Sequence, residues 1–121
     1  MKKKTLKFRE EELFLQVTQY KNNGNIAILA YTEEEPYGDI TINLSGFSID
    51  EDEGFINSIT KDSGLEQKLI KAGIIKEVIT TVKYNMGKYD MVIFNIEKLK
   101  EYDPIGVEKY QKNRDNQEEF E

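Results

Sequence analysis

Clustered carboxylates are the side chains of this chain that are best suited, by type and spacing, to metal binding or acid–base catalysis. Three consecutive glutamates stand at positions 33–35, and four consecutive acidic residues stand at 50–53. Carboxylates ligate divalent cations, and a converging pair can act as general acid and general base. The first run predicts no converging pair, because neighbouring residues of a strand point to opposite faces. The second run precedes Gly54, and an EF-hand calcium loop has glycine at its sixth position. The first ligand of such a loop would then be Ile49, whose side chain cannot bind calcium. We therefore expect both runs to form exposed acidic loops, with no metal and no cofactor.

The other groups that commonly perform catalysis are missing or dispersed. The sequence contains no cysteine, histidine or tryptophan. Disulfides, thiolate nucleophiles, Cys/His zinc sites and histidine-based triads are therefore excluded. The eight glycines form neither a dinucleotide-binding fingerprint nor a phosphate-binding loop. We expect a protein without enzymatic activity.

The charge is distributed very unevenly along the chain. The formal net charge is −6, yet residues 33–66 alone hold ten acidic residues and one lysine. Residues 1–9 hold five basic residues and no acid, and the acids at 10–12 follow directly. Acidic surfaces repel phosphates but complement a basic groove on another protein, so we expect a protein partner and no direct binding of nucleic acid.

The sequence has no hydrophobic stretch long enough to cross a bilayer. We therefore expect no membrane association. The basic residues after Met1 are not followed by the apolar segment of a signal peptide, which favours a cytoplasmic location.

Alternating apolar and polar residues predict most of the strands that would position these acids. The expected strands cover roughly residues 12–21, 26–32, 39–44, 77–84 and 89–96, with a short edge strand at 4–8. The Asn-Gly pair at 23–24 predicts a turn between the first two of these strands. A helix is expected from about Gly64 to Gly73, and a second with Asp103 as its N-cap and Pro104 in its first turn.

This order of elements predicts an α+β fold. We expect an antiparallel sheet of about five strands, covered on one face by one or two helices. Residues 1–112 would form a single domain, and residues 113–121 would form a frayed polar tail.

Three segments of the sequence together resemble a known family. They are residues 34–38 running into 41–44, residues 52–56, and residues 99–104 with Gly106. Their order and spacing are similar to a small uncharacterised family carried on mobile elements and phages of Gram-positive bacteria, over roughly residues 12–110. The resemblance implies an accessory gene product, in the company of anti-CRISPR and antirestriction proteins.

Charge and resemblance together suggest an inhibitor of a host defence nuclease, such as a Cas effector. Its acidic residues would occupy the nucleic-acid-binding groove of that nuclease, which requires them to lie on one rigid face. The alternative is a non-enzymatic interaction or homodimerisation module that uses an exposed sheet edge at 4–8 or 77–96. The candidate partner-binding residues are Glu33, Glu34, Glu35, Tyr37, Asp39, Asp50, Glu51, Asp52 and Glu53.

Overall fold

The structure, a computed structural model, describes residues 3–47 and 49–119 of the 121-residue chain. Lys2 of the basic segment and residues 120–121 of the predicted tail lie outside the described residues. The elements in chain order are β1 (Leu6–Phe8), β2 (Glu11–Gln19), β3 (Ile26–Tyr31), β4 (Pro36–Asp39), β5 (Thr41–Ile42), β6 (Glu53–Ile56), α1 (Ser58–Asp62), α2 (Leu65–Lys71), β7 (Ile75–Tyr84), β8 (Gly87–Phe94), α3 (Ile96–Tyr102) and α4 (Pro104–Glu119).

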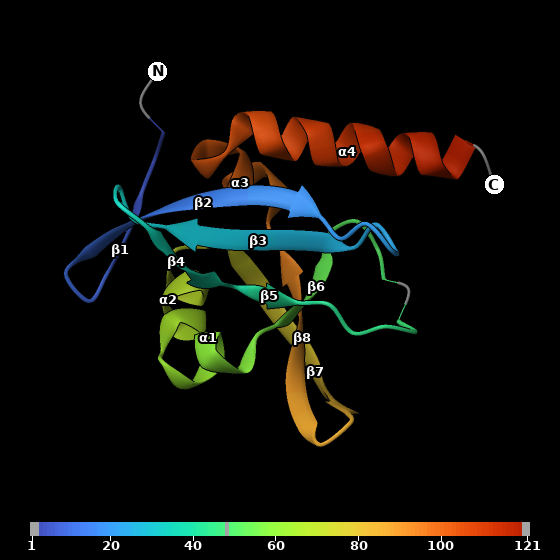
Figure 1. Cartoon of the computed structure of the whole chain (residues 1–121), viewed down its shortest axis with the longest axis horizontal. Coiled ribbons are helices and arrows are strands. Elements are labelled where there is room, and N and C mark those ends of the chain that lie inside the picture. Colours follow the sequence, from blue (N-terminus) through green and yellow to red (C-terminus); the bar gives the residue numbers. More distant parts are fainter. Residues whose placement is uncertain (1–2, 48, 120–121) are drawn as a thin grey trace.

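The α+β class is confirmed, but the strands form two antiparallel sheets instead of one. The first four-stranded sheet has the order β1-β2-β3-β4, and the second has the order β5-β6-β8-β7. The helices also exceed the one or two expected: α3 and α4 pack against β2, and α2 packs against β7. Figure 1 shows α4 lying along β2 and β3, with α1 and α2 on the opposite side of these strands.

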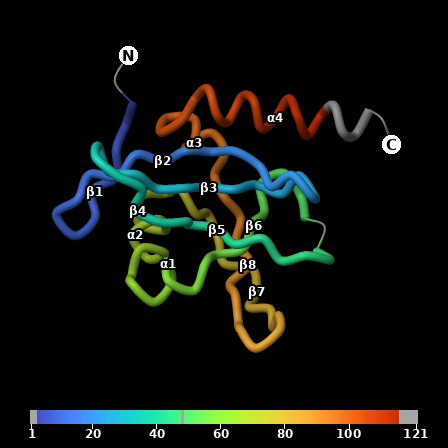
Figure 2. The backbone as a smooth tube through the Cα atoms, in the orientation of Figure 1, coloured from blue at the N-terminus to red at the C-terminus, as the bar shows by residue number. Residues whose placement is uncertain are grey.

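The predicted strand at 39–44 is divided between the two sheets. Its first residue ends β4, whereas Thr41 and Ile42 form β5. Buried Ile40 lies between them: its amide donates to the carbonyl of Ile28, and its carbonyl accepts from the amide of Asn57, both at 2.9 Å. The backbone thus passes from one sheet to the other without reversing direction (Figure 2). A strand with two partners in different sheets cannot be recognised from its alternation alone.

The inward faces of the two sheets and the helices share one main core. Alternate residues of β2 are buried, as its period of two predicted. They meet buried side chains of β8 and of the last two helices, among them Val92, Phe94, Leu99, Val107 and Tyr110. A smaller cluster around Leu44, Ile49 and Phe55 fills the space under the loop that precedes β6.

Close packing at Gly54 in β6 gives a direct test of this core. A Cβ atom at Gly54 would lie 2.6 Å from the Phe94 ring and 3.2 Å from Ile26 Cγ2. We expect Gly54→Ala to lower the free energy of unfolding by about 2 kcal/mol, because the ring must move within a filled core. Urea denaturation would measure this loss.

Gly38 in β4 provides the matched control for that substitution. A Cβ atom there meets nothing within 4 Å. Gly38→Ala should leave stability unchanged or raise it by up to about 1 kcal/mol, because alanine restricts the unfolded chain. Equal losses at the two positions would contradict the role assigned to the Phe94 contact.

The last helix includes most of the segment predicted as a polar tail, because α4 extends to Glu119. Its anchoring contacts reach Arg114, whose guanidinium donates to the carbonyls of Gly24 and Ile49. Among the helices of residues 3–47 and 49–119, none combines the length and apolar character needed to span a membrane.

Candidate functional site

The glutamates at 33–35 stand on a tight turn between β3 and β4. The hydroxyl of Thr32 accepts from the amides of Glu34 and Glu35, and the Thr32 amide donates to the carbonyl of Glu35 at 2.9 Å. All three glutamate side chains are exposed. A local hydrogen-bonded turn therefore holds these three charges in water at one end of the first sheet.

A second glutamate triplet, at residues 10–12, lies beside the first. It belongs to the β1–β2 hairpin: Glu10 is in the turn, and Glu11 and Glu12 begin β2. Arg9 and Glu10 both have positive φ, as a two-residue turn requires. Both triplets line one open groove of about 570 Å³, together with Lys7 and Thr32. We call this surface, formed by residues 10–12 and 33–35, the acidic groove.

The acidic residues at 50–53 do not join this groove. They lead into β6, and Figure 1 places them towards the opposite end of the molecule from the β3–β4 turn. Glu51, Asp52 and Glu53 are partly buried, and Glu53 accepts from the amide of Asp50 at 2.8 Å. The structure thus corrects the expectation that the acids of 33–66 share one face, because the chain crosses between sheets inside that window.

The remaining two candidate residues both lie on β4 and border the same small notch beside α1. Asp39 is exposed and pairs with Leu29 in the strand register, on the outer face. Tyr37 is 40% exposed and lines a small apolar notch with Ile59 of α1. Neither residue lines the acidic groove.

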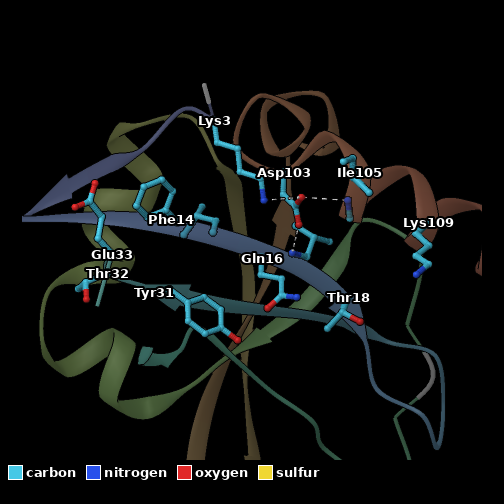
Figure 3. Close-up of a pocket in the computed structure, with 13 residues that line it drawn as sticks. Lys3, Phe14, Gln16, Thr18, Tyr31, Thr32, Glu33, Asp103, Ile105 and Lys109 are labelled. Atoms are coloured by element: carbon cyan, nitrogen blue, oxygen red, sulfur yellow. Dashed lines mark hydrogen bonds and ion pairs between the residues drawn. The ribbon is translucent and has the colours of Figure 1, made fainter. Parts of the chain in front are cut away.

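A second, larger groove of about 690 Å³ runs along the outer face of β2 and β3 towards α4. Phe14 of β2 and Tyr31 of β3 are directly paired across the strands and half-buried, so both rings line its floor. Ile105, at the start of α4, is 73% exposed on its other wall, near Lys109 (Figure 3). We call this surface the aromatic groove.

Asp103 fixes the wall of the aromatic groove. Its Oδ2 accepts from the Val17 amide of β2 at 2.9 Å, and its Oδ1 accepts from the Gly106 amide at 3.1 Å. Lys3 Nζ lies 3.5 Å from the same carboxylate (Figure 3). A Cβ atom at Gly106 would lie 2.5 Å from the Val17 carbonyl, so only glycine lets α4 begin this close to β2. The segment at 99–104 with Gly106 therefore has a positioning role.

A buried pair of carboxyl groups, Glu66 of α2 and Asp90 of β8, lies apart from both grooves. Burial, followed by the hydrogen bond and the charge of Asp90, raises the pKa of Glu66 to about 7. Burial alone would raise the pKa of Asp90, but hydrogen bonds from Thr81, Glu66 and Lys61 lower it. Glu66 Oε1 has no hydrogen-bond partner within the described residues.

This pair has pKa values pushed in opposite directions, as acid and base pairs of enzymes often have. Its surroundings favour a structural role. Both side chains are about 95% buried, and Lys61 Nζ and the Thr81 hydroxyl bind Asp90 at 3.1 and 2.7 Å. Ser58 and Lys61 also have the S-x-x-K spacing of serine–lysine dyads, but the Lys61 ammonium is directed to Asp90. In residues 3–47 and 49–119, no cluster of three or more acidic side chains is arranged to hold a metal ion.

Sequence reasoning missed two features of this region. It noted residues 10–12 only as acids that follow the basic terminus, whereas the antiparallel pairing of β2 with β3 brings them beside 33–35. It also did not recognise the cross-strand pair of Phe14 and Tyr31. The available signal was that Phe14 lies on the same side of β2 as the polar residues Gln16 and Thr18.

Comparison with known proteins identifies one family. A family model described as a domain of unknown function (DUF4313) matches residues 14–114. No curated protein and no solved structure matches the chain. The matched segment includes β3, the turn at 33–35, Asp103 and most of α4, whereas the triplet at 10–12 precedes it.

Proposed function

The chain belongs to the DUF4313 family of domains of unknown function, and we propose that it is a non-enzymatic binding protein whose acidic groove contacts a basic surface of a partner protein. The observation that carries this proposal is the meeting of two glutamate triplets around one groove, with Lys7 as its basic lining residue. Six like charges at one end of a domain repel each other unless a partner neutralises them.

The partner that we propose is a nuclease of host defence, either a Cas effector or a restriction enzyme, in the bacterial cytoplasm. Such enzymes hold nucleic acid in channels lined with lysine and arginine. A protein encoded by a mobile element or phage would inhibit the enzyme by placing the acidic groove on that basic lining. The contribution of each exposed ion pair is small, so several must act together.

Matched neutralisation of the two acidic groups tests this assignment. We expect the triple variant Glu33→Gln, Glu34→Gln, Glu35→Gln to weaken binding to the inhibited nuclease about 10- to 100-fold, because three ion pairs are lost. The control is Asp50→Asn, Glu51→Gln, Asp52→Asn, which removes the same charge from the other end and should change binding less than about threefold. Surface plasmon resonance between 50 and 300 mM salt would measure both variants.

A panel of purified, guide-loaded Cas effectors and restriction enzymes provides the partners for this measurement. At least one should be inhibited in DNA cleavage, with an affinity that falls steeply as salt increases. Inhibition by none of them would contradict the proposed target. Equal effects of the two triple variants would contradict the proposed surface.

A homodimer remains the alternative, and the position of β7 favours it. This ten-residue strand lies at the edge of the second sheet, with Val78 and Ile79 exposed. Irregularities in its pairing with β8, near Ile75 and Val78, interrupt the edge, which makes regular pairing with another strand harder. Analytical ultracentrifugation separates the alternatives, because an edge-to-edge dimer would persist at high salt.

A further inference from the structure

We propose that the aromatic groove receives an apolar side chain of the same partner protein, which therefore presents an apolar anchor next to a run of basic residues. This inference rests on the proposed function of the acidic groove. It adds a second contact, and it defines the chemistry of the partner segment.

The two grooves form one continuous surface. Thr32 and Glu33 line both of them. The strand register gives the order on the outer face: Lys7 pairs with Glu12, and the next outward position of β2 is Phe14, paired with Tyr31. A partner segment that neutralises the glutamates therefore reaches the two rings within a few residues.

The aromatic groove has the composition of an anchoring pocket. Its floor contains two aromatic rings, and the apolar side chain of Ile105 is left largely in water on its wall. Large apolar side chains exposed around a concavity commonly mark a binding surface, and buried anchors dominate the affinity of interfaces. The wall is held in place by the contacts of Asp103 with Val17 and Gly106, so the groove is formed before a partner arrives.

The charge around the groove selects a protein segment over a nucleic acid. Aromatic rings can stack on bases, but that mode needs a basic track for the phosphates. Two lysines, Lys3 and Lys109, line this groove, and Lys3 is paired with Asp103, so the lining offers no row of cations for successive phosphates. The neighbouring acidic groove also repels phosphates. Lysine or arginine beside an aromatic or long aliphatic residue complements both grooves.

Two exposed isoleucines allow a matched test. Ile105 and Ile59 are 73% and 75% exposed, and each is the second residue of its helix. Only Ile105 lines the aromatic groove. Ile105→Ser and Ile59→Ser alter no charge, and neither removes a buried side chain, so both variants should fold.

Random dodecapeptides displayed on phage and selected on the purified chain at 50 mM salt serve as the probe. We expect the enriched peptides to combine an apolar anchor with at least two lysines or arginines. Fluorescence anisotropy with a synthetic copy of such a peptide should show binding about tenfold weaker for Ile105→Ser, with its salt dependence retained, and unchanged within twofold for Ile59→Ser.

The outcomes separate this inference from the function on which it rests. Basic peptides without an apolar anchor, or equal affinities of the two serine variants, would overturn the anchor while leaving the acidic groove intact. Selection of apolar peptides without basic residues, which bind the wild type and the Glu33–Glu34–Glu35 triple glutamine variant with equal affinity, would overturn the proposed function. Failure to enrich any peptide would overturn both.

Discussion

Replacement of Asp103 by alanine is expected to lower the free energy of unfolding by about 3 kcal/mol. The side chain is 4% exposed and acts as both the N-cap of α4 and an acceptor for the edge of β2. Loss of the cap costs about 1 kcal/mol. The buried Val17 amide would also lose its charged hydrogen-bond acceptor. This loss lowers the free energy of unfolding by about a further 2 kcal/mol. Urea denaturation at pH 7 would measure the sum.

A second helix cap supplies the control for Asp103. The Asn95 side chain caps α3 by accepting from the Lys98 amide at 3.0 Å, without a bond to a strand. Asn95→Ala should therefore cost only about 1 kcal/mol. Equal losses for the two alanine variants would show that the bond to β2 contributes nothing. Asp103→Ala should also reduce peptide binding in the aromatic groove, because the hydrogen bonds that hold the start of α4 against β2 are lost.

Asp103 also shows which part of the fold could be predicted from the sequence. Its role as a cap was predicted from the Asp-Pro pair, because capping is local and depends on neighbouring residues. The hydrogen bond to Val17 spans 86 positions, and no local pattern encodes it. The same division holds for the strands: the turn between β2 and β3 was predicted from the Asn-Gly pair at 23–24, whereas the pairing of β6 with both β5 and β8 was not predicted.

The candidate site followed this division between local and long-range information. The triplet at 33–35 was predicted as exposed because three successive charges cannot be buried without partners. Its distance from residues 50–53, and its proximity to 10–12, depend on where β3 ends and where Ile40 leaves the first sheet. Counting charge over residues 33–66 therefore identified an acidic surface at 33–35. It wrongly grouped residues 50–53 with that surface and left out residues 10–12.

The buried pair of Glu66 and Asp90 should make the protein less stable as the pH rises. The pKa of Glu66 is raised from 4.5 to about 7 on folding, so between these values the folded protein holds a proton that the unfolded chain has released. Folding therefore takes up a proton, and the free energy of unfolding decreases with increasing pH in this window. From pH 5 to pH 8 the expected loss from this group is on the order of 2 to 3 kcal/mol. Asp90 has a lowered pKa, so its own titration falls below this window.

Glu66→Gln isolates this effect, because glutamine keeps the shape of a protonated glutamate and cannot titrate. Urea denaturation at several pH values should give similar stabilities of the two proteins at pH 5 and a more stable variant at pH 8. The other charges facing Glu66 are Lys61 and Asp90. The pKa of Lys61 is raised and that of Asp90 is lowered, so neither group changes its charge between pH 5 and 8. Parallel pH profiles of wild type and variant would contradict a shared proton between the two carboxyl groups. Divergence between pH 5 and pH 7 that levels off at higher pH would instead show that the contact of α2 with the second sheet depends on one buried proton.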